Sequence, residues 1–297
     1  MKIGLIGCGR WGRLILRDLV SLGADVSVVV PSQASRATAL AKGAASAFAT
    51  LDALPDMDGY VIAVPTVSHA ETIDALLPRG RPIFVEKPLT CDAASAARIA
   101  RAAPDRVFCM DKWRYHGGVL ELADLARSGE LGRILAIHTW RLDFGNPHAD
   151  VDASWILLPH DLSIVQEVVG TVPAVTSASG YRSGASDASL VTVLGGGRHG
   201  PLVTCEISSL HPVKRRSMVV VGTTGSAQYG DSYDTSVRLC RPGAEPQDLP
   251  IETGMPLLAE LGAFLDHLAG GAAPKSSAQE AALVVARVAE ARRLAGF

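Results

Sequence analysis

The feature that most constrains this chain is a glycine pattern between a short apolar run and an amphipathic segment near the N-terminus. Residues Lys2–Ile6 form the apolar run, and Gly7-Cys8-Gly9-Arg10-Trp11-Gly12 follows directly. Apolar residues then recur at helical spacing over residues 14–20. A strand, a glycine turn and a helix in this order are typical of a dinucleotide-binding unit, because bare backbone can approach a pyrophosphate and the helix N-terminus supplies N–H donors. We therefore expect Gly7, Gly9, Arg10, Trp11 and Gly12 to bind a dinucleotide.

The order of predicted elements indicates two domains. In the first third, β-branched runs at residues 2–6, 26–30, 60–64, 82–85 and 106–110 alternate with helical stretches. Strand-like segments then follow one another at residues 134–142, 174–180, 189–194, 202–208, 217–222 and 237–240, and helical patterns at 257–269 and 277–295 close the chain. We expect an α/β protein with a doubly wound parallel Rossmann sheet over residues 1–115. Residues 116–297 are expected to form an α/β domain with a large open mixed or antiparallel sheet, whose closing helix can pack back on the first domain.

Composition excludes several classes of function. Twenty-eight basic and 30 acidic residues give a formal net charge of −2, which offers no field for nucleic acid or for an anionic membrane. The five cysteines are scattered without CxxC spacing and are expected to be reduced thiols. The eight histidines show no metal-binding spacing, so no metal is expected. Neither a signal-peptide core nor an apolar stretch near the roughly 20 residues of a membrane span is present, which favours a cytoplasmic protein that acts on a small polar metabolite.

The residues after the second predicted strand bear on the choice of cofactor. An acidic residue there would bind a free ribose 2′-hydroxyl. This chain has Pro31-Ser32-Gln33 instead, with Arg36 one helical turn later. Ser32 and Arg36 would suit a 2′-phosphate, which favours NADP(H) among the NAD(P)(H) cofactors. If Arg36 is only a solvated helix residue, either cofactor can bind.

Two titratable residues are candidates for chemistry. Pro88 keeps Lys87 extended after the strand at residues 82–85, so the Lys87 side chain can project from the carboxyl edge of the sheet, where open α/β folds bind ligands. His160 follows Pro159 and opens an apolar helical pattern, which predicts a position at a helix start. Imidazole, with a pKa of about 6.5, is suited to remove a hydroxyl proton near neutral pH.

Several motifs in a fixed order resemble those of the glucose-fructose oxidoreductase / inositol 2-dehydrogenase / MocA (Gfo/Idh/MocA) family. They are the glycine turn, Ala63-Val64-Pro65-Thr66 with His69, Glu86-Lys87-Pro88-Leu89, residues 128–132 and residues 155–163. The last stretch and the element at 211–214 look most like the nucleotide-sugar 3-dehydrogenase branch. The resemblance covers essentially the whole chain.

The resemblance implies an NAD(P)-dependent dehydrogenase that acts on a secondary hydroxyl of a sugar, nucleotide sugar or cyclitol. It assigns Val64, Pro65, Thr66, His69, Glu86 and Lys87 to the cofactor's neighbourhood, although His69 can also be a helix N-terminal residue satisfied by backbone. It implies a homodimer or homotetramer through the C-terminal sheet.

In the expected reaction, His160 removes the hydroxyl proton while Lys87 hydrogen-bonds the same oxygen. Many family members carry an acid four residues before the histidine, where this chain has Ile156. Asp161 is therefore a candidate for orienting or tuning His160. Asp161 is also a candidate substrate contact, together with Tyr115, Arg141, Asp143, Asn146 and Trp155. Lys214, Arg215 and Arg216 are expected to form a solvated basic face.

Two other functions are compatible with the same scaffold. One is an imine or biliverdin-type reductase, which needs no alcohol-directed base. The other is a non-catalytic dinucleotide sensor, which the presence of both Lys87 and His160 disfavours. Replacing His160 separates these hypotheses, because a dehydrogenase loses turnover whereas dinucleotide sensing survives.

Overall fold

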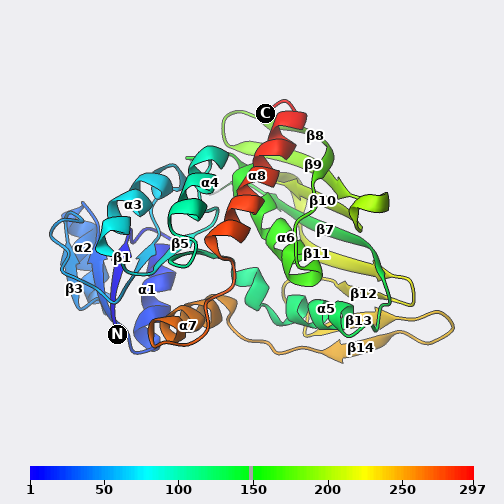
Figure 1. Cartoon of the computed structure of the whole chain (residues 1–297), viewed down its shortest axis with the longest axis horizontal. Helices are drawn as coiled ribbons and strands as arrows, with labels where there is room; N and C mark the ends of the chain where they lie inside the picture. The colour runs from blue at the N-terminus through cyan, green and yellow to red at the C-terminus, as the bar shows by residue number, and fades with distance from the viewer. Residues whose placement is uncertain (147–149) are drawn as a thin grey trace. The chain divides into compact units, whose positions relative to one another are not determined.

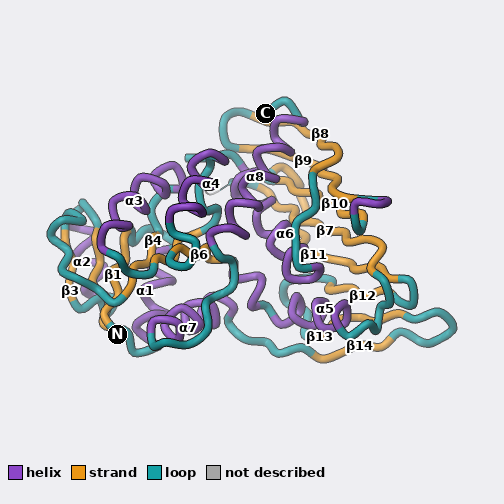
Figure 2. The backbone as a smooth tube through the Cα atoms, viewed as in Figure 1, coloured by secondary structure: helices purple, strands orange, loops and turns teal. Residues whose placement is uncertain are grey.

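The computed structural model describes residues 1–146 and 150–297, which fall into two compact units (Figure 1). Unit 1 comprises Met1–Lys112 and Met255–Ala282, and unit 2 comprises Trp113–Gly254 and Leu283–Phe297. The division passes through α8 (Ala278–Leu294). Figure 2 shows the alternation of helices and strands along the tube in the N-terminal part of the chain and the run of strands that follows it.

Unit 1 contains the expected parallel Rossmann sheet. Its six strands lie in the order β3-β2-β1-β4-β5-β6, and every neighbouring pair is parallel. The strands are β1 (Lys2–Ile6), β2 (Asp25–Val29), β3 (Ser46–Phe48), β4 (Gly59–Ile62), β5 (Ile83–Glu86) and β6 (Val107–Met110). The helices are α1 (Gly12–Ser21), α2 (Gln33–Ala41), α3 (His69–Leu76), α4 (Ala93–Ala102) and α7 (Pro256–Leu268), with short 3-10 turns η1 (Thr66–Ser68), η2 (Leu77–Arg79) and η3 (Lys112–Tyr115). All carboxyl ends of the strands therefore lie at one edge, as parallel pairing requires.

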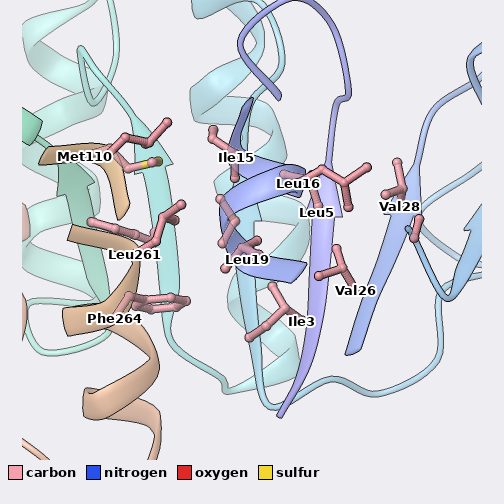
Figure 3. Close-up of a cluster of buried hydrophobic side chains, with 14 of the residues drawn as sticks. Ile3, Leu5, Ile15, Leu16, Leu19, Val26, Val28, Met110, Leu261 and Phe264 are labelled. Carbon is pink, nitrogen blue, oxygen red and sulfur yellow. The ribbon is translucent and has the colours of Figure 1, made fainter. Parts of the chain in front are cut away.

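The core of unit 1 joins its two chain segments. Ile3 and Leu5 of β1 and Leu16 and Leu19 of α1 are fully buried, and α7 adds Leu261 and Phe264 to the same cluster (Figure 3). The rings of Phe84 and Phe264 stack with centroids 5.0 Å apart. Residues 255–282 are thus part of unit 1, although they follow residues 113–254 of unit 2 in the sequence.

Unit 2 is built on an eight-stranded mixed sheet in the order β14-β13-β12-β11-β7-β10-β9-β8. The β7–β10 pair is parallel, and the other pairs are antiparallel. The strands are β7 (Ile134–Phe144), β8 (Val175–Ser183), β9 (Asp187–Gly195), β10 (Leu202–Ser208), β11 (Leu210–Gly222), β12 (Ser226–Tyr229), β13 (Ser236–Cys240) and β14 (Gln247–Pro250). Helices α5 (Gly117–Arg127) and α6 (Ala153–Val169) belong to this unit, with a short 3-10 turn η4 (Gly197–His199) between β9 and β10. The mixed sheet agrees with the expected fold class.

Helix α6 begins at Ala153, seven residues before His160, which was predicted to open the helix. Asp152 caps it by accepting a hydrogen bond from the Ser154 N–H at 3.0 Å, and the helix runs through Pro159. A proline inside a helix removes one backbone hydrogen bond, but Leu158 and Leu162 on either side of it are fully buried, so packing keeps the helix continuous. The prediction that His160 opens a helix is therefore wrong, because His160 lies in the middle of α6.

Within the residues that the structure describes, no helix combines the length and apolar character that crossing a bilayer requires. All five cysteines are free thiols.

Candidate functional site

The glycine turn leaves room for a phosphate at one of its three glycines. Gly7 has φ +92°, and a Cβ there would lie 2.4 Å from the Ala63 carbonyl oxygen. A Cβ on Gly12 would lie 2.6 Å from the Gly7 carbonyl oxygen. These two glycines are required by close packing of the protein itself. A Cβ on Gly9 would meet no described atom within 4 Å, so the backbone there is open to a pyrophosphate at the start of α1.

The end of β2 carries the two residues considered for a 2′-phosphate. Ser32 caps α2, and its hydroxyl oxygen accepts from the Ser35 N–H at 3.4 Å. Arg36 folds back over the turn, where its Nη1 donates to the carbonyl oxygens of Val30 at 3.1 Å and Pro31 at 2.5 Å. The guanidinium therefore lies at the end of the second strand, where residues of this fold contact the ribose of a bound dinucleotide.

His69 connects two loops at the carboxyl edge of the sheet. Its side chain is 1% exposed, with Nδ1 2.9 Å from the Pro88 carbonyl oxygen and Nε2 3.2 Å from the Val64 carbonyl oxygen. The Lys87–Pro88 peptide bond is cis. His69 thus connects the Val64-Pro65-Thr66 loop to the backbone that follows Lys87. These contacts agree with the alternative in which backbone groups satisfy the His69 side chain.

Glu86 links the glycine turn to Lys87. The Trp11 indole Nε1 donates to Glu86 Oε1, and the Lys87 backbone N–H donates to Glu86 Oε2 at 3.1 Å. The Lys112 ammonium lies over the Trp11 ring, 4.4 Å from its centroid. Desolvation raises the pKa of Glu86 to about 7, against the opposing effects of Lys87, the Trp11 hydrogen bond and Lys112.

In unit 2, the residues around His160 are held by a buried ion pair. Asp161 Oδ1 accepts from Arg141 Nε at 2.9 Å and from Arg141 Nη2 at 2.8 Å, and both side chains are buried. The Arg141 guanidinium also lies over the Trp113 ring at 4.7 Å. Burial raises the pKa of Asp161, and Arg141 opposes the shift. Arg141 and Asp161 are therefore engaged with each other, while the half-buried His160 lies on the preceding residue of the same helix.

The other predicted substrate contacts have different surroundings. Trp155 is buried in the first turn of α6, with the Arg292 guanidinium 5.3 Å from its ring centroid. Tyr115 is half-buried at the end of η3. Asn146 donates from Nδ2 to the Ser186 carbonyl oxygen at 2.9 Å. Ile156 is buried.

Arg216 was assigned to a solvated face, and this prediction is wrong. Its side chain is 19% exposed, and its Nη2 donates to Asp143 Oδ2 at 2.8 Å. Arg216 pairs with Arg141 across β11 and β7, so the two guanidiniums lie on one face of the sheet. Burial, with a further contribution from Arg141, lowers the pKa of Arg216. The partner of Arg216 is set by the strand register, which could not be recognised from the basic run at residues 214–216.

Comparison with known proteins agrees with these features. A family model described as "Oxidoreductase family, NAD-binding Rossmann fold" (GFO_IDH_MocA) matches residues 1–108. The match to the Gfo/Idh/MocA family model thus covers the N-terminal third of the chain. Inositol 2-dehydrogenase 2 of Saccharopolyspora erythraea is 29% identical over 199 residues, which are 62% of this chain and 58% of that protein's length. Inositol 2-dehydrogenase of Streptomyces avermitilis is 27% identical over 284 residues, 80% of this chain and 82% of the relative.

Solved structures show the same fold over nearly the whole chain. UDP-N-acetylglucosamine 3-dehydrogenase GnnA from Acidithiobacillus ferrooxidans has a TM-score of 0.86 at 21% identity and covers 99% of this chain and 97% of its own. A levoglucosan dehydrogenase in complex with NADH and levoglucosan has a TM-score of 0.88 at 16% identity and covers 100% of this chain and 97% of its own.

The residues present fit an NAD-type cofactor. Gly9 leaves open space at the N-terminus of α1, and the Gfo/Idh/MocA family model that matches this region is described as NAD-binding. Within the described residues, no group of three or more His, Cys, Asp and Glu side chains could hold a metal ion.

Proposed function

We propose that this protein is an NAD(P)-dependent oxidoreductase that interconverts a secondary hydroxyl and a ketone on a sugar, nucleotide sugar or cyclitol. The observation that carries the proposal is the arrangement in unit 1, where Lys87 follows β5 at the sheet edge and Glu86 connects its backbone to the glycine turn. Relatives named inositol 2-dehydrogenase and a solved levoglucosan dehydrogenase with NADH support this class of substrate.

The glycine turn and the first N–H groups of α1 would bind the phosphates of a dinucleotide, and Val64, Pro65 and Thr66 would border it. Such a cofactor would supply hydride transfer to or from the substrate carbon. Lys87 donates a hydrogen bond to the substrate oxygen and stabilises negative charge that develops there. His160 accepts the hydroxyl proton during oxidation and returns it during reduction. A lysine ammonium near His160 would favour the neutral imidazole, the form that can act as a base.

The contacts of Arg141 and Asp161 support a positioning role for this pair. Because Arg141 holds Asp161 from β7, it fixes the turn of α6 that carries His160. Substrate recognition then falls to Tyr115 and Trp155 among the predicted residues.

NADP(H) is the proposed preferred cofactor. Pro31 and Ser32 follow β2 in place of an acid, and Arg36 places a cation on the same turn. The test compares the KM for NADP(H) with the KM for NAD(H). An Arg36→Ala variant should lose at least about tenfold of the preference for NADP(H), and an unchanged ratio would contradict the role of Arg36.

A homodimer or homotetramer through the sheet of unit 2 is also proposed. Most residues of β8 are exposed, and Tyr181 on this strand is 60% exposed. Light scattering on the purified protein should give a mass of two or four chains.

The test of the activity is absorbance of the reduced nicotinamide with a panel of nucleotide sugars, free sugars and cyclitols, with each dinucleotide and in both directions. His160→Asn should lose most turnover and keep dinucleotide affinity. If no polyol or ketose reacts while the dinucleotide binds, the protein is a sensor and the dehydrogenase proposal fails. Turnover of imines with His160→Asn fully active would favour an imine reductase.

A further inference from the structure

Beneath the glycine turn of unit 1 lies a group of charged and aromatic side chains, which we call the Glu86 cluster. Its members are Trp11, Glu86, Asp111, Lys112 and Glu260. They come from the turn before α1, the end of β5, the residues after β6 and helix α7. Elements far apart in the sequence thus bring these groups together at the carboxyl edge of one sheet.

Glu86 uses its two oxygens for two different elements. Oε1 accepts from the Trp11 indole N–H, and Oε2 accepts from the Lys87 backbone N–H at 3.1 Å. One carboxyl group therefore bridges the phosphate-binding turn and the residue proposed to contact the substrate. A change in the charge of Glu86 therefore affects both the turn and the backbone of Lys87.

The Trp11 indole has a second contact, on the face of its ring, in addition to the hydrogen bond from its N–H group. The Lys112 ammonium lies 4.4 Å from the Trp11 ring centroid. A cation over an indole face is attracted by the ring quadrupole. Since Trp11 is the residue immediately before the first residue of α1, the orientation of its side chain is linked to the backbone that would bind phosphate.

The surroundings of Glu86 contain groups of both signs. Lys87 and Lys112 favour its ionised form, while its desolvation favours the neutral acid. Glu260, which is 1% exposed, faces Glu86, Asp111 and Lys112, and Cys109 on β6 faces Asp111, Glu86, Glu260 and Lys87. Burial raises the pKa of Glu260 and that of Cys109 well above their usual values, so burial favours the neutral form of both groups beside Glu86.

We propose that Trp11 and Glu86 are positioning residues whose hydrogen bond holds the glycine turn in its dinucleotide-binding conformation when Glu86 is ionised and loosens it when Glu86 is protonated. The physical reason is that a carboxylate accepts a stronger hydrogen bond from the indole than a neutral acid does. The proposal rests on the proposed dinucleotide binding, and it makes the affinity for the dinucleotide depend on pH through a group that takes no part in the reaction.

The first test uses the protein without cofactor. The chain has four tryptophans, and the ¹H–¹⁵N signal lost in Trp11→Phe identifies the Trp11 indole. That signal should shift with a midpoint near pH 7 in the wild type and stay fixed in Glu86→Gln, which keeps an acceptor oxygen but cannot ionise. A Trp11 signal that does not titrate, or that titrates equally in Glu86→Gln, would overturn the proposal. Glu86→Gln changes no other charged group of the cluster, so a titration with another origin would persist.

The second test measures NADH affinity by calorimetry, because NADH lacks a 2′-phosphate that titrates in the same range. The wild type should bind about fivefold more tightly at pH 8 than at pH 6, from the difference between a charge-assisted and a neutral hydrogen bond. Trp11→Phe and Glu86→Gln should each remove this pH dependence.

The matched control is Trp140→Phe, which changes a tryptophan on β7 of unit 2 and should behave as the wild type. An affinity that depends on pH equally in all four proteins would refute the role of the Trp11–Glu86 pair. If NADH and NADPH fail to bind at any pH, the proposed function fails, and the indole titration still decides whether Glu86 controls Trp11.

Discussion

Replacing Asp161 with asparagine should unfold unit 2 more readily while leaving the shape of the side chain unchanged. Arg141 and Asp161 are 4% and 2% exposed, and two guanidinium nitrogens donate to one carboxylate oxygen. Removing one member of a buried pair leaves an uncompensated charge and typically costs about 3 to 5 kcal/mol. Because the asparagine oxygen can still accept one hydrogen bond, we expect a loss of about 3 kcal/mol in the free energy of unfolding.

A double variant separates the cost of an unpaired charge from the value of the pair. Burial raises the pKa of Asp161 even with Arg141 beside it, which means that the ion pair only partly offsets desolvation. Arg141→Met combined with Asp161→Leu should therefore lie within about 1 kcal/mol of the wild type. Urea unfolding followed by tryptophan fluorescence measures both variants. The reasoning is refuted if Asp161→Asn loses less than about 1 kcal/mol while kcat falls more than about tenfold, since Asp161 would then act in the reaction rather than in holding α6.

Three further variants test other parts of the structure. Gly7→Ala should lower stability by about 2 to 3 kcal/mol in thermal unfolding, because φ is +92° and the Cβ would lie 2.4 Å from a carbonyl oxygen, whereas Gly9→Ala should fold normally. For Glu260, whose folded pKa is raised, stability is lost as pH rises above the unfolded value of 4.5, by about 1.4 kcal/mol per pH unit until the folded pKa is reached; Glu260→Gln should remove this slope in urea unfolding at several pH values. Arg292→Met should cost about 2 kcal/mol in urea unfolding because Arg292 Nη1 donates to both Asp152 oxygens at 2.6 Å, and an unchanged midpoint would show that the α6 cap does not need it.

The sequence predicted those strands whose residues form clear β-branched runs. Segments β1 and β10 were placed at their observed bounds, whereas β3, β12 and β14 have only three or four residues and give no periodic signal. Strand β11 begins at Leu210 rather than 217, because its first half is polar and charged and owes its strand conformation to pairing with β7.

The side-chain pairs of the site could not be predicted from sequence spacing. Trp11 and Glu86 are 75 residues apart. They meet because only β4 lies between β1 and β5, and the carboxyl ends of these parallel strands lie at the same edge of the sheet. Arg216 looked solvated in a basic run, but its register opposite Arg141 turns it to the same face of the sheet. The sequence predicted which kinds of side chain the site contains, whereas the partner of each side chain depends on strand order and register.

A double-variant cycle with Lys87 and His160 tests the central proposal most directly, that both side chains act in the same reaction step. The measurement is kcat for the wild type, Lys87→Met, His160→Asn and the double variant on a substrate found in the panel, with dinucleotide affinity measured in parallel. Groups that act as a unit give non-additive losses, so the double variant should be about as slow as the slower single variant. Losses that multiply, or a single variant with wild-type kcat, would contradict the account.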